Sequence, residues 1–158
     1  MQSCTKLSVV VFPYLINHFV FIIIWCSAST YGQKVINWSD LTQGISWEAP
    51  SLENLFPGFQ EASFSQDMQE LEGKKVILTG YYLILDSRQS VFLLSKNPMA
   101  SCFFFGNGGP ETVVDLRFSE PPKFDMDDLL SVEGVLRLNP DDPELCYYRI
   151  EEANAVRY

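Results

Sequence analysis

The longest β-rich segment of the chain, residues 74–85, most constrains what the chain can fold into. Valine, isoleucine, leucine and tyrosine dominate this stretch, and Gly80 interrupts it near the middle. A glycine inside a strand indicates a bulge or a sharp bend. A long first strand that bends at a glycine is typical of a small closed barrel.

Four more β-rich segments follow, separated by short stretches that contain Gly, Pro, Asp and Asn. They cover residues 90–95, 112–118, 130–138 and 146–156. Five strands within about 85 residues predict a mainly β protein with a five-stranded OB-like barrel. A β-sandwich is the alternative, but it usually needs about seven strands.

Residues 33–64 form a lead-in to this barrel, and the barrel domain spans residues 65–158. No hydrophobic period is sustained in the lead-in, so we expect irregular structure. Its large aromatics are too many for a disordered linker and should pack on the barrel. They are Trp38, Trp47, Phe56, Phe59 and Phe64. One short helix is expected at 65–71, with Ser65 as its N-cap and Gly73 as its stop.

Residues 1–32 have the pattern of a secretory signal peptide. Lys6 supplies a positive charge, residues 7–25 are almost wholly apolar, and small residues follow. Thr30 and Gly32 suit the −3 and −1 positions of a cleavage site, so the mature chain is expected to begin at Gln33.

Two alternatives to cleavage remain open. Residues 7–26 are about as long as a membrane span and could stay as an uncleaved anchor. Cys26 could instead carry a lipid, although Trp25 before it is a poor fit to that processing site. Each alternative leaves the folded part exported, in the periplasm or elsewhere in the cell envelope.

Composition excludes several classes of function. After position 32 the chain has 10 Lys and Arg against 20 Asp and Glu, so its net charge is −10. Such a surface repels phosphate backbones, and nucleic acid is not expected as a partner. The single histidine, His18, lies in the leader. The mature chain therefore lacks every histidine-based catalytic or metal site, and we expect no enzyme activity and no cofactor.

Two cysteines remain after processing, Cys102 and Cys146. An oxidising compartment allows a disulfide between them, but the geometry decides. Both also lie beside aromatic residues, where unpaired buried thiols are common, and this is the preferred interpretation. A metal or redox site that uses both thiols is the further alternative.

A glycine-rich loop follows Cys102 and three consecutive phenylalanines, and it is a candidate binding loop. Its residues are Gly106, Asn107, Gly108, Gly109, Pro110 and Glu111. Such a loop can form an anion-binding nest, but it contains no Lys or Arg, so a simple permissive turn is the better interpretation. The acidic runs 125–128 and 141–144 are expected to be solvated loops rather than calcium sites.

The sequence also resembles a family of uncharacterised bacterial envelope proteins with an OB-like barrel. The matching residues are 71–81, Phe92-Leu93-Leu94, Cys102, Gly106, Gly109-Pro110-Glu111, Gly134-Val135-Leu136 and Tyr148-Arg149-Ile150. The resemblance covers about residues 66–158. It includes a Cys-x-x-Cys-Gly motif whose second cysteine is replaced here by Phe105, which leaves Cys102 as a weak metal-ligand candidate.

This resemblance implies an accessory role in the envelope, beside a transport or metal-homeostasis system. A single cysteine without histidine cannot close a tetrahedral zinc site. We therefore expect a non-catalytic, exported binding module with a protein partner in the envelope. The alternative is a thiol-based metal-binding or redox protein that uses Cys102 with Cys146.

Overall fold

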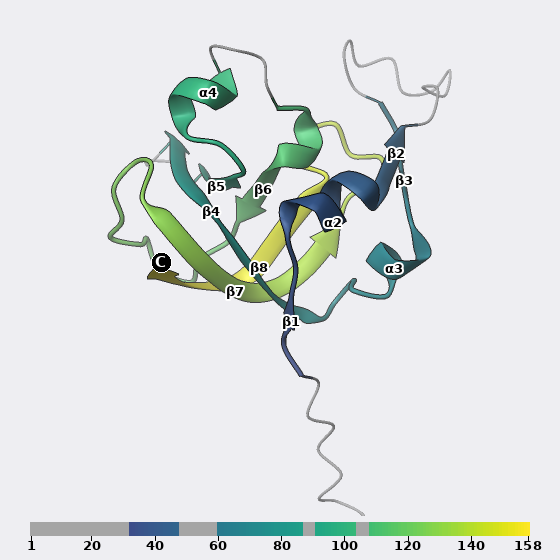
Figure 1. Cartoon of the computed structure of the whole chain (residues 1–158), viewed down its shortest axis with the longest axis horizontal. Helices are drawn as coiled ribbons and strands as arrows, with labels where there is room; N and C mark the ends of the chain where they lie inside the picture. The colour runs from purple at the N-terminus through teal and green to yellow at the C-terminus, as the bar shows by residue number, and fades with distance from the viewer. Residues whose placement is uncertain (1–31, 48–59, 87–90, 104–107) are drawn as a thin grey trace, which may run out of the picture. The chain divides into compact units, whose positions relative to one another are not determined.

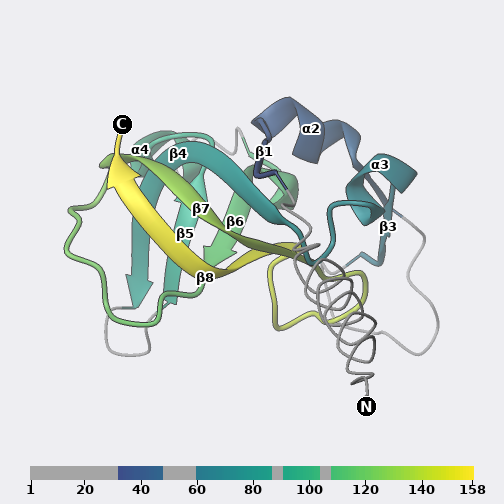
Figure 2. The ribbon, with the colours of Figure 1, turned by 90° about the horizontal axis from the view of Figure 1, so that it is seen from below.

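Five strands close into a barrel, as the sequence predicts (Figures 1 and 2). Around the barrel their order is β4 (Lys75–Asp86), β5 (Val91–Ser95), β6 (Val113–Leu116), β8 (Tyr148–Arg157) and β7 (Leu129–Leu138), and β7 pairs back onto β4. Every strand lies within two residues of its predicted bounds. This computed structural model describes residues 32–47, 60–86, 91–103 and 108–158, without the side chains of residues 102 and 103.

The long strand β4 pairs with two neighbouring strands. Its residues up to Tyr81 pair with β7, and those from Tyr81 onward pair with β5. The pairing with β7 passes through Gly80 without a register shift, so no bulge lies there; the shift in β4 comes later, between Ile84 and Asp86. Gly80 instead permits close packing, because a Cβ at this position would lie 2.7 Å from the Ser95 carbonyl oxygen.

Alternation along the strands divides the side chains between the core and the outside. The core of the barrel comes from the even-numbered positions of the strands, with Tyr82 and Tyr148 as its largest fully buried side chains. Tyr147, the neighbour of Tyr148, packs edge-on against Trp47. Both tyrosines are therefore buried, and Tyr147 is covered in part by the lead-in.

A bulge late in β8 changes which positions of that strand face the core. Glu133 of β7 pairs with Asn154, whereas Val135 pairs with Glu151, and Glu152 in the bulged strand has a φ of +52°. Gly134 lies opposite the bulge, where a Cβ would lie 2.5 Å from the Glu151 carbonyl oxygen. Only glycine allows the two strands to approach this closely.

The lead-in is more regular than predicted. It contains β1 (Lys34–Val35), which pairs in parallel with β4, the helix α2 (Trp38–Gln43), and β2 (Ile45–Trp47), which pairs with β3 (Ala62–Phe64). A capping box starts α2: the Asn37 side chain accepts from the Asp40 backbone N–H, and Asp40 accepts from the Asn37 N–H. The helix is too short to sustain a hydrophobic period, so the expectation of irregular structure was wrong here.

Three of the five aromatics of the lead-in contact the barrel. Trp38 donates its Nε1–H to the Thr79 carbonyl oxygen at 2.8 Å, and Phe64 packs edge-on against Tyr148. Trp47 packs against Tyr147, as described above. Phe56 and Phe59 lie outside the described residues.

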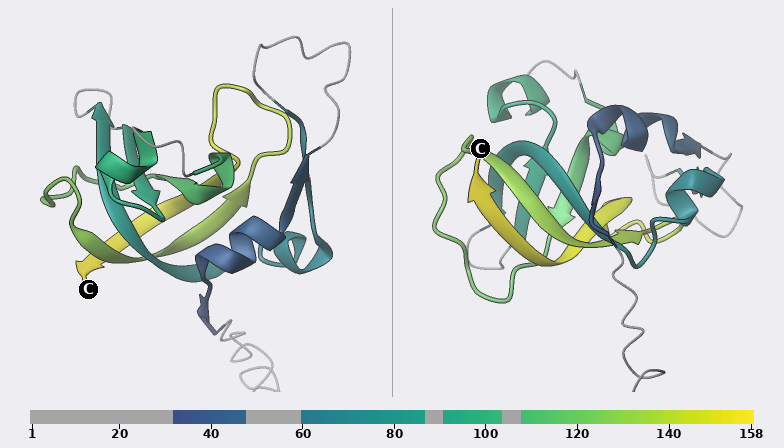
Figure 3. Two further views of the ribbon diagram at one scale, coloured as in Figure 1. Left: turned by 45° about the horizontal axis from the view of Figure 1, so that its top comes forward. Right: turned by 60° about the horizontal axis from the view of Figure 1, so that its bottom comes forward.

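The described residues contain three short helices rather than the single one predicted. The predicted helix is α3 (Gln66–Gln69), with Ser65 as its N-cap and Gly73 beyond it at a φ of +73°. The unexpected ones are α2 and α4 (Met99–Phe103), and a 3-10 turn, η1, covers Pro110–Thr112. Figure 3 shows α2 and α3 on the same side of the barrel. No helix in the described ranges is long and apolar enough to cross a membrane, and the predicted leader lies outside them.

Candidate functional site

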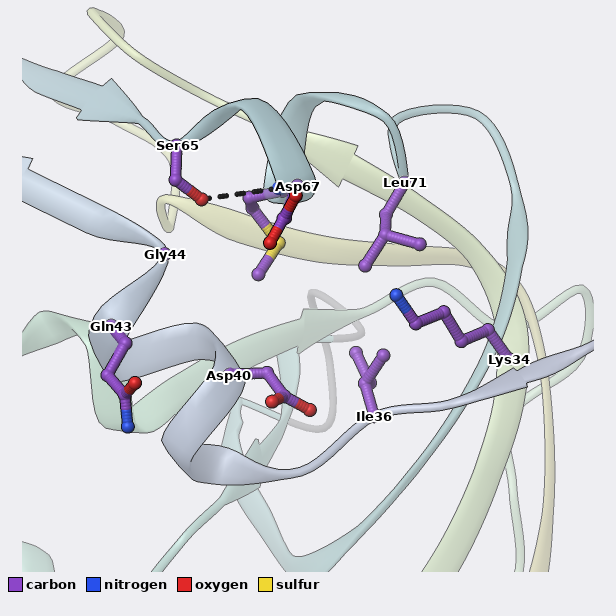
Figure 4. Close-up of a pocket in the computed structure, with 9 residues that line it drawn as sticks. Lys34, Ile36, Asp40, Gln43, Gly44, Ser65, Asp67 and Leu71 are labelled. Carbon is purple, nitrogen blue, oxygen red and sulfur yellow. Dashed lines mark hydrogen bonds between the residues drawn. The ribbon is translucent and has the colours of Figure 1, made fainter.

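A hollow of about 300 Å³ opens between the first residues of the lead-in and α3 (Figure 4). We call it the α2–α3 hollow; β1, α2, its C-cap Gly44 and the segment from Ser65 to Leu71 line it. Ligand pockets in proteins start at about this volume. The hollow is therefore large enough for one side chain or a small molecule.

Close packing at Gly44 shapes one end of this hollow. A Cβ at Gly44 would lie 2.7 Å from both the Asp40 carbonyl oxygen and the Cε atom of Met68. The Gly44 carbonyl oxygen accepts a hydrogen bond from the Ser65 backbone N–H at 2.9 Å. A glycine at this point therefore lets the end of α2 rest directly on the start of α3.

The floor of the hollow is apolar. Ile36, Met68 and Leu71 line it with exposed fractions of 3%, 2% and 6%, and all three belong to the main hydrophobic core. The floor is therefore held by the same packing that holds the barrel, which fixes its shape.

Charged groups surround this floor. Lys34, Asp40 and Asp67 come from β1, α2 and α3, and Figure 4 shows their head groups directed into the same space. One oxygen of Asp40 accepts the Asn37 N–H at 2.9 Å. Within the described ranges, neither Lys34 nor Asp67 forms an ion pair with another residue. Two carboxylates and one ammonium thus face an apolar surface, and Lys34 and Asp67 have no ion-pair partner among the described residues.

A second cluster of charges lies on the outside of the barrel. Asp115 on β6 is only 4% exposed, and one of its oxygens accepts from Nε and Nη2 of Arg117 at 2.8 and 2.7 Å. Arg149, its register partner on β8, pairs with Glu151, which also binds Arg137. The hydrogen bond from Arg137 lowers the pKa of Glu151.

Two buried atoms of this cluster have no hydrogen-bond partner among the described residues, Oδ1 of Asp115 and Nε of Arg149. One is an acceptor and the other a donor, and they lie on adjacent strands. A bridging water, the usual occupant of such internal polar sites, can supply the hydrogen bonds that these two atoms lack. The Arg137–Glu151 ion pair of this cluster links β7 to β8.

The candidate thiol Cys146 lies beside this cluster. It is a half-buried free cysteine, and burial raises its pKa to about 11, with a further contribution from the Asp115 carboxylate. At neutral pH the thiol is protonated and is a poor nucleophile and metal ligand. The side chain of Cys102, on α4, lies outside the described part, so the preferred prediction of two unpaired thiols and the alternative of a pair are not tested at Cys102. In that same part, no group of three or more His, Cys, Asp and Glu side chains is placed to hold a metal ion.

The candidate binding loop is described only from Gly108 onward; Gly106 and Asn107 lie outside the described residues. Gly109 precedes η1 with a φ of −74°, and its carbonyl oxygen accepts from the Thr112 hydroxyl at 2.7 Å. Pro110 and Glu111 form the first turn of η1. The described part of the loop is thus a turn closed by its own hydrogen bonds.

The acidic run 125–128 is largely exposed, and its carboxylates also accept local hydrogen bonds. Asp128 accepts from Nε and Nη2 of Arg157 at 3.0 and 2.8 Å, and this hydrogen bonding lowers its pKa. Asp127 accepts the Met99 backbone N–H at 2.7 Å, which ties this loop to the start of α4. The run 125–128 is therefore a solvated loop, as predicted, that local hydrogen bonds also hold in place.

The sequence analysis identified none of the residues that line the α2–α3 hollow as a site. The spacing of Asn37 and Asp40 is a capping signal, and it could have located α2. Nothing in the sequence indicates that Lys34 and Asp67 come together, because they belong to separate segments that only the tertiary structure joins.

Comparison with known proteins identifies the fold and leaves the activity open. No family model and no curated protein matches this sequence. A crystal structure of a DUF3299 family protein from Pseudomonas aeruginosa is similar, with a TM-score of 0.54 and 18% sequence identity. The match covers 80% of this chain and 97% of that chain. At this identity the likeness shows a common fold with a protein of an uncharacterised family.

Proposed function

We propose that this protein is a non-catalytic, exported accessory module of the bacterial cell envelope that binds a segment of a partner protein in the α2–α3 hollow. The observation that carries the proposal is the hollow itself. It combines a rigid apolar floor with ionised groups, of which Lys34 and Asp67 have no ion-pair partner in the described part of the chain. Convergent polar groups over an apolar surface are the usual features of a binding site.

Export is supported by the signal-peptide pattern of residues 1–32. Association with a transport or metal-homeostasis system rests on the family resemblance of residues 66–158. The thiol alternative gains no support from Cys146, because its raised pKa keeps the thiol protonated at neutral pH.

Site-specific photo-crosslinking in the producing cell tests the binding proposal. A photoreactive phenylalanine analogue replaces Gln43, an exposed residue that lines the hollow. The matched control carries the analogue at Lys123, which is exposed in a different part of the molecule. We expect one discrete crosslinked species from position 43 that is absent from position 123. Equal crosslinking from both positions, or none from 43, would contradict binding in the hollow.

Export is tested on the same preparations. Intact mass spectrometry of the accumulated protein should give a chain that begins at Gln33. A mass that includes residues 1–32 would indicate an uncleaved anchor, and a lipid on Cys26 would indicate a lipoprotein. Either result would place the protein on the membrane. Accumulation of the whole chain in the cytoplasm would contradict export.

A further inference from the structure

The charges of the α2–α3 hollow select the chemical class of its ligand. Building on the proposed function, we infer that the hollow receives a basic side chain of the partner, a lysine or an arginine. The cation lies between the Asp40 and Asp67 carboxylates, and the aliphatic stem lies on the floor formed by Ile36, Met68 and Leu71.

Charge complementarity is the first step of the argument. The two carboxylates come from opposite walls, α2 and α3, and one ammonium group, that of Lys34, reaches the same space (Figure 4). The hollow therefore has one carboxylate in excess. The chain after residue 32 as a whole strengthens this field, because its net charge is −10. Such a field attracts cations and repels acidic segments.

The apolar floor is the second step. A small hydrated cation gains nothing from Ile36, Met68 and Leu71, which are all more than nine-tenths buried. Lysine and arginine combine a long aliphatic stem with a charged end, and they bury the stem on apolar surface while the charge stays in a polar setting. A basic side chain is thus the amino-acid side chain that uses both features of the hollow.

The chain offers few cations of its own for this position. Among the residues outside the described ranges, the only Lys and Arg residues are Lys6, in the predicted leader, and Arg88, in the connection between β4 and β5. The segment 48–59, which lies between β2 and β3 in the sequence, has acidic residues but no Lys or Arg. The basic side chain is therefore expected to come from another protein.

Lys34 acts as the resident counter-ion in this arrangement. Its ammonium group shares the space with the two carboxylates, and an incoming basic side chain competes with it for them. Removing the charge of Lys34 should therefore strengthen binding of a cation and weaken binding of an anion, which gives the test a definite sign.

Titration with model side chains, followed by amide chemical shifts, tests the ligand class. The protein is the form that the producing cell accumulates, and the probes are N-acetyl-lysine amide, N-acetyl-arginine amide, N-acetyl-norleucine amide and N-acetyl-glutamate amide. The two basic probes should shift the amides of Asp40, Gly44 and Asp67 with a Kd on the order of 1 mM, as suits so small a ligand. The norleucine and glutamate probes should bind much more weakly.

Three variants give the direction of the effect. Asp67→Asn should weaken binding of the basic probes about two- to fivefold, and Lys34→Met should strengthen it by about the same factor, as expected for partly exposed charge pairs. Glu120→Gln is the matched control, since it removes one charge far from the hollow and should leave binding unchanged.

The outcomes separate the ligand class from the proposed function. Preference for the glutamate probe, or weaker binding of basic probes to Lys34→Met, would overturn the inference of a basic ligand. Equal loss in Asp67→Asn and Glu120→Gln would show that only net charge matters and would overturn it as well. Crosslinking from position 43 could persist in either case, and the proposed function would then stand with another ligand.

Discussion

One buried hydroxyl links the barrel to α2, the helix that forms one wall of the hollow, in addition to the Trp38–Thr79 hydrogen bond. The Tyr148 hydroxyl, in the core, donates to the Leu41 carbonyl oxygen of α2 at 2.8 Å. Both residues are fully buried. The change Tyr148→Phe removes this donor while leaving the ring contact with Phe64 in place.

The expected cost follows from these contacts. A buried neutral hydrogen bond contributes about 1 kcal/mol net, and an acceptor left without a partner in the core adds a desolvation penalty of about 1 kcal/mol or more. The free energy of unfolding should therefore fall by about 2 kcal/mol. With a urea m-value of about 2 kcal/mol/M for a domain of this size, the unfolding midpoint should fall by about 1 M.

Urea unfolding of the chain that begins at Gln33, followed by far-UV circular dichroism, measures this midpoint. Tyr158→Phe is the matched control, since it makes the same chemical change at a side chain that is 83% exposed, and its midpoint should not move. Amide exchange in α2 should also become faster in Tyr148→Phe. A midpoint equal to that of the control would refute the reasoning, because removal of the hydrogen bond to the Leu41 carbonyl would then have no effect on the free energy of unfolding.

Other outcomes follow from positions elsewhere in the barrel. Gly134→Ala should lower the thermal midpoint by roughly 5–10 °C, because the added Cβ overlaps the Ile150 side chain and the Glu151 carbonyl; an unchanged midpoint in calorimetry would show that the bulge can relax. Cys146 should react with iodoacetamide about a hundredfold more slowly at pH 8 than a free thiol, since its pKa is about 11; peptide mass spectrometry gives the rate, and reaction as fast as a small thiol would contradict the burial of Cys146. The same raised pKa means that this thiol's contribution to stability is complete below about pH 9 and is lost as the pH rises toward 11, because the unfolded chain releases the proton first. Unfolding midpoints compared across that range, for the natural chain and for Cys146→Ala, should show a steeper decline for the natural chain.

The strands were predictable from the sequence for a local reason. Residues 74–85 are rich in β-branched and other large apolar residues, residues 130–138 carry such residues in near alternation, and the structure places strands at Lys75–Asp86 and Leu129–Leu138. The helix α3 was also predictable, because Ser65 and Gly73 mark its ends. These features depend on contacts within a few residues of sequence.

The short elements of the lead-in were missed because their signals are weak. The helix α2 has only six residues, and Leu41 is its one buried residue, so no hydrophobic period can develop. The strand β1 has two residues and exists only because Lys34 and Val35 pair with Val76 and Ile77 of β4. Such elements take their stability from the barrel and not from their own propensities.

The sequence by itself determined the barrel, its acidic surface and the absence of histidine after residue 32, since these depend on local periodicity and composition. Only the tertiary structure decided the α2–α3 hollow. Lys34, Asp40 and Asp67 meet there because β1 pairs with β4, Leu41 accepts from Tyr148, and Gly44 rests on Met68. Each of these contacts joins residues that lie far apart in the chain, and pairings of that kind leave no periodic signal in the sequence.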